Sequence, residues 1–197
     1  MSAVTIQRLI VGISGASGAV YGVRVLQALK GLGIETHLVM SKTAEVTLAH
    51  ETDLKVAEVK ALATVVHAPG DLAAGPSSGS FRTDGMIVAP CSVKTLAEIA
   101  TGATTNLLAR AADVTLKERR RLVLLVRETP LHAGHLRNML AVTELGGIVM
   151  PPVPAFYARP ASLDDMVDHT IGRALDLFGL DAGLAQRWGE TKGRRRR

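Results

Sequence analysis

Short polar segments follow apolar runs at several places in the chain, and the first has the composition of an anion-binding turn. "SGASGA" (14–19) follows the apolar run "LIVGI" and places Ser14 and Ser17 among small residues. Such a turn lets backbone N–H groups converge at the start of the next helix, which favours a phosphate. Its glycines are spaced by three, so they match neither the dinucleotide fingerprint nor a P-loop. A tight strand-to-helix turn without a ligand is the alternative interpretation.

Two later segments carry comparable chemistry. In "PCSVKT" (90–95), Ser92 can cap a helix and Thr95 lies one turn in, so hydroxyl and N–H groups could meet a phosphate or a flavin edge. Arg127 and Glu128 follow five apolar residues and precede Thr-Pro, the place where a strand of a binding site would end. The alternatives are a plain capped helix for the first segment and a surface ion pair for the second.

The cysteine and the histidines predict neither a nucleophile nor a metal site. Cys91 is the only cysteine, so no intramolecular disulfide can form, and no histidine stands in its motif. We therefore interpret it as a small buried residue. His132 and His135 are one helical turn apart without a third ligand beside them, which disfavours zinc.

The elements that must position these residues alternate along the chain. Apolar runs predict six strands, at 8–14, 34–41, 63–68, 85–92, 121–128 and 147–152. Helical patterns predict helices at 18–33, 42–53, 93–102, about 105–118, 131–146 and 162–179. Strands that are apolar throughout are typical of an α/β fold with a doubly wound, mostly parallel sheet and helices on both faces. Ligands bind such sheets beyond the carboxyl ends of the strands, so the polar segments should share one crevice.

Composition indicates one domain of ordinary size. Of the 197 residues, 47% are hydrophobic, and no run approaches the ~20 apolar residues of a membrane span. Lys192 and Arg194 to Arg197 carry five of the 23 basic charges, so the remaining chain balances its 18 acidic residues. We predict a domain over 1–190 and a basic disordered tail over 191–197. We expect a cytoplasmic protein, because we find no signal peptide, and neither a nucleic-acid nor a membrane partner.

Several motifs in order resemble one family. They include "GISGASGAVYG", "SSGSFRTDGMIVAPCSVKTLAEIATG", "LVRETPLHAGHLRNML", "PPVPAFYARP" and "RWGE", and the resemblance runs from Leu9 to Trp188. Together they resemble the flavin prenyltransferases (UbiX/Pad-type), formerly described as aromatic acid decarboxylases. The resemblance implies a single-domain Rossmann-like flavoprotein that binds reduced FMN and dimethylallyl monophosphate. It further implies prenyl transfer to flavin N5 and then C6, without a metal, which yields prenylated FMN for a UbiD-type decarboxylase. Family members form dodecamers in which several subunits build each site.

The resemblance also assigns residues. The FMN-binding positions it implies are Gly15, Ala16, Ser17, Ser41, Ser92, Val93, Lys94, Thr95 and Arg127. The prenyl-phosphate positions are Arg110, Lys117, Tyr157 and Arg173. The catalytic positions are Ser17, Glu51, Glu128 and Lys117. Cations suit a departing phosphate, and closing a ring at C6 releases a proton that a carboxylate such as Glu128 can take. The segment 54–76 lacks a tryptophan seen in some relatives, and Lys94 stands where many have a small residue.

Two other functions remain open at this stage. A flavin-dependent decarboxylase of the peptidyl- or pantothenoyl-cysteine type needs a histidine base and an Asn-containing motif. The chain has "HETD" near the first place but "LVRETP" at the second. An FMN-binding accessory subunit of an aromatic acid decarboxylase would need no second phosphate pocket.

Overall fold

A computed structural model describes residues 7–189, whose strands form one parallel sheet. The six strands are ordered β3-β2-β1-β4-β5-β6, and every neighbouring pair is parallel. Their bounds are β1 Arg8–Ile13, β2 Glu35–Met40, β3 Val65–His67, β4 Gly85–Cys91, β5 Arg121–Val126 and β6 Ile148–Val149. The predicted doubly wound α/β fold is confirmed.

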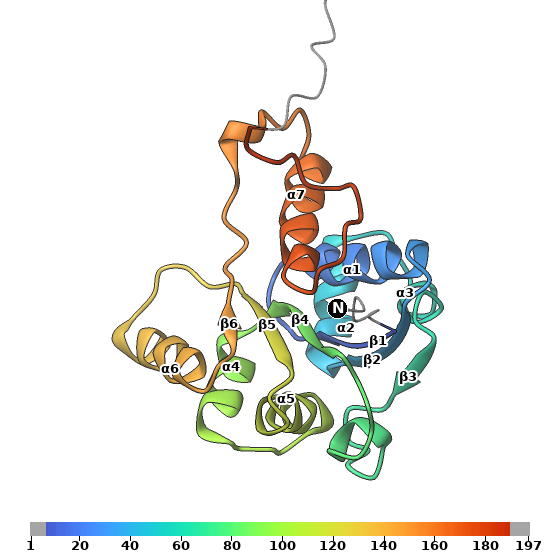
Figure 1. Ribbon diagram of the computed structural model, residues 1–197, viewed down its shortest axis with the longest axis vertical. Coiled ribbons are helices and arrows are strands. Elements are labelled where there is room, and N and C mark those ends of the chain that lie inside the picture. The colour runs from blue at the N-terminus through green and yellow to red at the C-terminus, as the bar shows by residue number, and fades with distance from the viewer. Residues whose placement is uncertain (1–6, 190–197) are drawn as a thin grey trace, which may run out of the picture.

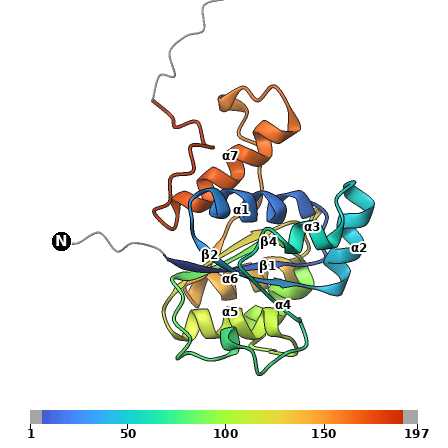
Figure 2. The same ribbon diagram turned by 90° about the vertical axis from the view of Figure 1, so that its right-hand side faces the viewer.

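Helices cover both faces of the sheet. They are α1 Ala19–Gly31, α2 Lys42–Glu51, α3 Val56–Lys60, α4 Val93–Thr101, α5 Leu107–Lys117, α6 Ala133–Glu144 and α7 Leu163–Asp176. Helices α1 and α7 lie on one side of the sheet, and α4, α5 and α6 lie on the other (Figures 1 and 2). Both faces of the central strands are therefore buried, which explains why these strands are apolar throughout.

Side chains of each central strand point alternately to the two faces of the sheet, and a separate hydrophobic core lies on each face. In β1, Leu9, Val11 and Ile13 pack with the buried side chains of α1 and α7, while Ile10 packs with those of α4 and α5. All seven residues of β4 are buried. Because successive side chains of a strand point to opposite faces, one apolar run serves both cores.

The connections after β1 and β4 create the opening for a ligand. These two strands are neighbours at the centre of the sheet. The chain leaves β1 for α1 on one face and leaves β4 for α4 on the other. The two exits diverge, so a crevice opens at the carboxyl ends of the strands, the binding place of doubly wound sheets.

Beyond β6 the chain departs from the sequence prediction. The sixth strand is only two residues long, because Pro151 and Pro152 cannot donate the hydrogen bonds that would extend it. The following segment leads through a short 3₁₀ turn, η2 (Phe156–Ala158), to α7, which extends above the sheet in Figure 1.

Two further differences concern short helical elements. The helix α3 was not predicted; its first turn is closed by Glu58, whose carboxylate accepts the Lys55 backbone N–H at 2.6 Å. The 3₁₀ turn η1 (Gly75–Ser77) interrupts the segment predicted as a loop. The predicted basic tail lies outside the described residues. Among the helices of residues 7–189, none is both long and apolar enough to cross a membrane.

Candidate functional site

A cavity of about 630 Å³ lies at the carboxyl ends of the strands. It is lined by Gly15, Ala16, Ser17, Ser41, Lys42, Thr43, Pro69, Gly70, Ser92, Val93, Lys94, Thr95, Glu98, Asn106, Leu108, Arg127 and Glu128. All nine positions predicted to bind FMN are among them, although they come from the ends of four different strands. Topology alone brings these distant segments together.

Three helices begin beside this cavity, and residues at the starts of α2 and α4 line it. Ser41 caps α2 by accepting the Ala44 N–H at 3.1 Å, and Ser92 caps α4 by accepting the Thr95 N–H at 3.2 Å. Helix α1 begins after Gly18, whose φ of 98° suits glycine and which carries no side chain to act as a cap. Helix N-termini carry partial positive charge, so their convergence favours a bound anion.

Glu51 supplies the missing cap of α1 from the end of α2. Its carboxylate accepts the Gly18 N–H at 2.8 Å and the Ala19 N–H at 2.9 Å. Partial burial alone would raise the pKa of Glu51. Hydrogen bonds from Ser17, Ala19 and Gly18, with the charge of Arg127, outweigh burial and hold that pKa below its ordinary value. Glu51 is therefore ionised and holds the turn between β1 and α1 in place.

We expect Glu51→Gln to destabilise the protein by about 1 kcal/mol at pH 7, the usual value of a helix cap. The folded-state pKa is lowered, so the carboxylate stabilises the fold fully above the unfolded-state pKa of about 4.3, and this stabilisation is lost as pH falls from there through the lower folded-state pKa. Urea unfolding of both proteins between pH 7 and pH 3.5 should show the difference shrinking towards the acid end. Asp53→Asn, an exposed neighbour, serves as the control. A difference that is constant with pH would contradict this role.

Ser14 does not belong to the ligand surface, although the sequence suggested a hydroxyl donor there. Its buried hydroxyl donates to the Pro90 carbonyl at 2.9 Å and accepts the Ser92 N–H at 2.7 Å. Ser14 therefore ties the end of β1 to the end of β4. Cys91 is completely buried, and burial raises the pKa of its thiol, which keeps the thiol protonated and agrees with a packing role.

Arg127 and Glu128 place opposite charges in the cavity at the end of β5. The Arg127 backbone N–H donates to the Cys91 carbonyl at 3.0 Å, which carries the pairing with β4 to this point. Glu128 accepts the Thr129 N–H at 2.9 Å and also lines the cavity. The cavity thus contains a permanent cation for a phosphate and a carboxylate that can take up a proton.

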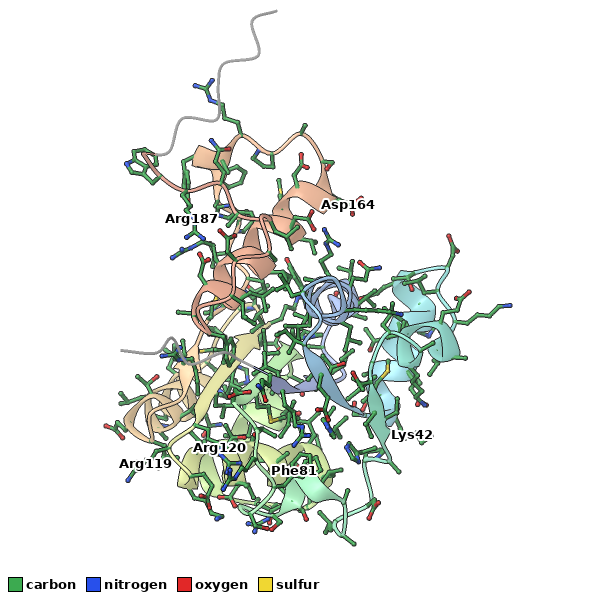
Figure 3. The ribbon with its side chains drawn as sticks, turned by 45° about the vertical axis from the view of Figure 1, so that its right-hand side comes forward. Lys42, Phe81, Arg119, Arg120, Asp164 and Arg187 are labelled. Carbon is green, nitrogen blue, oxygen red and sulfur yellow. The ribbon has the colours of Figure 1, made fainter. Side chains whose placement is uncertain are left out.

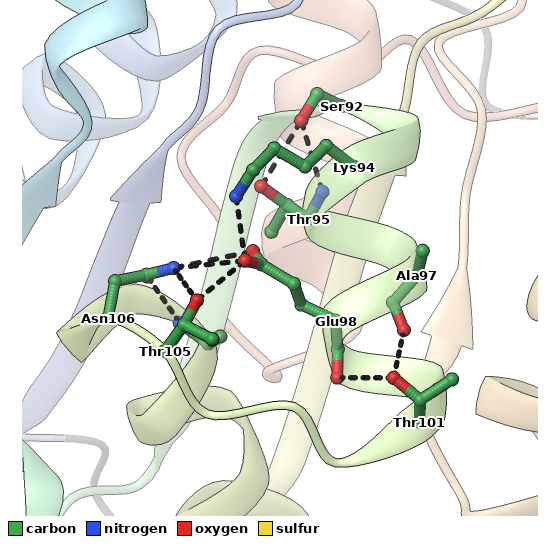
Figure 4. Close-up of polar contacts among 9 residues, drawn as sticks. Ser92, Lys94, Thr95, Ala97, Glu98, Thr101, Thr105 and Asn106 are labelled. Atoms are coloured by element: carbon green, nitrogen blue, oxygen red, sulfur yellow. Dashed lines mark hydrogen bonds and ion pairs between the residues drawn. The ribbon is translucent and has the colours of Figure 1, made fainter.

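A polar cluster that the sequence analysis missed, drawn in Figure 4, contributes Lys94, Glu98 and Asn106 to the lining of the cavity. Glu98 accepts hydrogen bonds from Lys94 Nζ at 2.6 Å, Thr105 Oγ1 at 2.8 Å and Asn106 Nδ2 at 3.3 Å. Asn106 in turn caps α5 by accepting the Ala109 N–H at 3.0 Å. Burial alone would raise the pKa of Glu98, but its bonds to Lys94 and Thr105 hold the pKa below its ordinary value. Glu98 therefore joins the starts of α4 and α5.

We expect Glu98→Gln to weaken FMN binding about threefold to tenfold and to destabilise the fold by about 1–3 kcal/mol. The Glu98 side chain is only 13% exposed. The loss of hydrogen bonds to a buried charged group usually costs about 1–3 kcal/mol of folding free energy. A glutamine amide would also direct its own N–H groups at Lys94 or Asn106. Flavin fluorescence titration and thermal unfolding measure the two effects, with the exposed Glu144→Gln on α6 as control. Unchanged flavin affinity would show that the cluster does not shape the cavity.

The predicted prenyl-phosphate residues do not line this cavity. Arg110 donates from Nε to the Ser77 carbonyl at 3.1 Å and pairs with Asp113 at 2.6 Å. Lys117 pairs with Glu118. The loop beside them is held by Arg120, whose Nη1 donates to the Phe81 carbonyl at 2.8 Å; Figure 3 shows both side chains at this end of the molecule.

The other two prenyl-phosphate positions belong to the C-terminal part of the fold. Tyr157 lies in η2 and Arg173 in α7, where Arg173 pairs with Asp176 at 2.7 Å. Arg187 also pairs with Asp176, at 2.9 Å, and so fastens the last described segment to α7. Within one chain the structure therefore gathers the nine predicted FMN-binding positions around one cavity, and the four predicted phosphate positions do not line it.

Some cavity residues were absent from the sequence prediction. They are Lys42, Thr43, Pro69, Gly70, Glu98, Asn106 and Leu108. Lys42 and Thr43 directly follow Ser41 at a strand end, a signal that could have included them. Glu98 and Leu108 reach the cavity from helices and Asn106 from the cap of α5, and no spacing in the chain indicates this. Among residues 7–189, no group of three His, Cys, Asp or Glu side chains could hold a metal ion.

A parallel α/β sheet with a cavity at its switch point is typical of nucleotide- and flavin-binding proteins of the doubly wound class. The Flavoprotein family model matches residues 2–175. The flavin prenyltransferase UbiX of Escherichia coli K12 is 60% identical over 92% of this chain and 98% of its own length. The chain belongs to the flavin prenyltransferase family.

Solved structures agree with this assignment. The crystal structure of AnUbiX (PadA1) in complex with FMN and dimethylallyl pyrophosphate has a TM-score of 0.93 at 55% identity and covers 95% of this chain and 100% of that one. A dodecameric FMN-dependent UbiX-like decarboxylase from Escherichia coli O157:H7 has a TM-score of 0.91 at 54% identity, covering 93% and 100%. The family resemblance expected from the motifs is confirmed.

Proposed function

We propose that this protein transfers a dimethylallyl group from dimethylallyl monophosphate to N5 and C6 of reduced FMN. The observation that carries the proposal is the cavity in which the N-termini of α2 and α4 and the side chain of Arg127 meet beside Glu128. A volume of about 630 Å³ lies in the range of cofactor pockets. Backbone N–H groups at helix N-termini and the Arg127 guanidinium can bind the phosphate of a flavin nucleotide. The residues that line the cavity therefore fit FMN.

The roles of the FMN-binding residues follow from their positions. Reduced FMN supplies the nucleophilic atoms of the reaction. Ser41, Ser92 and Thr95 offer hydroxyl groups, and the N-termini of α2 and α4 and the Arg127 guanidinium balance negative charge. Glu128 is the carboxylate that takes the proton lost when the second bond forms, and Ser17 lines the same cavity.

The prenyl phosphate needs residues from more than one copy of the chain. Arg110, Lys117 and Arg173 each pair with a carboxylate of their own chain, and none lines the FMN cavity. We infer that neighbouring subunits bring these cations and Tyr157 to the cavity, in a dodecamer like that of the Escherichia coli relative. Exposed apolar side chains support self-association: Leu136 and Leu140 on α6 are 53% and 58% exposed, and Phe156 is 74% exposed. Sedimentation velocity tests the assembly.

The activity is tested by anaerobic incubation with reduced FMN and dimethylallyl monophosphate, followed by mass spectrometry of the extracted flavin. We expect the flavin to gain one C5H8 unit. Lys117→Ala should reduce this gain about 10²- to 10³-fold while FMN affinity stays unchanged, because the lysine meets only the departing phosphate. The exposed Lys30→Ala at the end of α1 is the matched control. Bound but unmodified FMN, with the diphosphate donor also inert, would favour an FMN-binding accessory subunit.

The recipient of the product and the location of the protein stay predictions. We propose that prenylated FMN passes to a UbiD-type decarboxylase, and that both act in the cytoplasm. Adding the reaction mixture to such a decarboxylase in its cofactor-free form should restore decarboxylation. Restoration by FMN alone would contradict the proposed product.

A further inference from the structure

Tyr157 is held by two aromatic neighbours that the sequence analysis did not connect with it. Its ring meets that of His169 edge to face at 5.5 Å between centroids and that of Trp188 at 5.3 Å. The tyrosine oxygen lies 3.2 Å from His169 Nε2. Tyr157 itself is 47% exposed, so the residue lies at the surface of the chain.

His169 is buried and has one unused nitrogen. It is 8% exposed on α7, and within residues 7–189 its Nδ1 atom has no hydrogen-bond partner. In one tautomer Nδ1 carries the proton, and a buried N–H donor stays unsatisfied. In the other tautomer Nε2 carries the proton, and only an acceptor lone pair is left unsatisfied. Orphaned buried N–H groups are the rarer and costlier case, so the second tautomer is favoured.

The charge state of His169 agrees with this choice. Burial, followed by the charge of Arg173 one turn later on α7, lowers the pKa of His169, and Asp176 opposes this only weakly. The ring is therefore neutral at neutral pH, so one nitrogen carries the proton and the other carries a lone pair.

We propose that His169 is a positioning residue that donates its Nε2–H to the Tyr157 oxygen and thereby turns the tyrosine O–H towards the phosphate of the prenyl donor. A phenol oxygen that accepts one hydrogen bond has its own proton free for another acceptor. If His169 Nε2 instead accepted a hydrogen bond from the Tyr157 O–H, that O–H could not donate to the phosphate. This inference rests on the proposed function, in which Tyr157 binds the donor phosphate.

Steady-state prenylation kinetics test the effect on the donor. His169→Phe keeps an aromatic ring of similar size and removes the donor, so we expect the KM for dimethylallyl monophosphate to rise about tenfold, the value of one hydrogen bond to a charged group. FMN affinity should not change. His169→Gln, whose amide N–H can reach the tyrosine oxygen, should stay within about threefold of wild type.

A double-mutant cycle separates this role from general packing. In a Tyr157→Phe background, His169→Phe should have no further effect on KM, because the atom through which it acts is gone. An equal rise in both backgrounds, or a loss of FMN affinity, would show a merely structural role and overturn the inference. A wild-type protein that forms no prenylated flavin refutes the proposed function, and the inference falls with it.

Nitrogen-15 magic-angle-spinning NMR of the full-length, histidine-labelled protein tests the tautomer without any turnover. Comparison with His169→Gln identifies the signals of this residue among the six histidines. We expect a protonated Nε2 and an unprotonated Nδ1. The reverse pattern would overturn the inference even if the kinetic effect were found.

Discussion

Replacing Glu128 by glutamine should reduce the formation of prenylated FMN about 10²- to 10⁴-fold, the usual contribution of a positioned acid or base. Glutamine keeps the shape of the side chain and its hydrogen bond from the Thr129 N–H, which measures 2.9 Å. It cannot take up a proton. The loss should therefore appear in turnover, while the affinity for FMN changes less than threefold.

The measurement pairs flavin mass spectrometry with fluorescence titration of FMN. Glu144→Gln, an exposed change on α6, controls for the loss of one negative charge. Full activity in Glu128→Gln would remove the carboxylate from the mechanism. Joint loss of activity and FMN binding would instead assign Glu128 to the binding of the flavin.

Replacing Gly22 by alanine should destabilise the protein by about 1–3 kcal/mol, the usual cost of overpacking a core. A Cβ atom at this position would lie 2.4 Å from the backbone carbonyl oxygen of Ala89 and 2.7 Å from the side chain of Ile13. The carbonyl belongs to the central strand β4, whose backbone is held by pairing on both sides. Helix α1 must then move away from the sheet, and its N-terminus at the cavity moves with it.

The matched control lies on the same helix. Gly31→Ala meets no atom within 4 Å, so it should be neutral or stabilise the helix by up to about 1 kcal/mol. Urea unfolding measures both variants, and FMN affinity should fall only in Gly22→Ala. Equal stability of the two variants would show that α1 can shift on the sheet without cost.

The class of fold could be predicted from the sequence, and so could the strand ends at which the cavity opens. Apolar runs such as 8–13 and 85–91 are buried on both faces, and a run of this kind predicts a covered parallel strand whatever its partners. The glycines and serines that follow these strands must lie at one edge of the sheet, because all its strands run in the same direction. Family motifs then assigned Ser17, Ser92 and Arg127 to a cavity that the structure forms.

The contacts of a side chain with distant parts of the chain could not be predicted from its neighbours in the sequence. Ser14 and Ser17 look equivalent in "SGASGA", yet Ser14 is buried between β1 and β4 while Ser17 is exposed at the cavity. Glu51 caps a helix that begins more than 30 residues earlier, and no local pattern indicates such a cap. Glu98 and His169 stand in ordinary helical sequence. Their roles arise from contacts with Asn106 and Tyr157, which depend on how helices and turns pack rather than on the order of neighbouring residues.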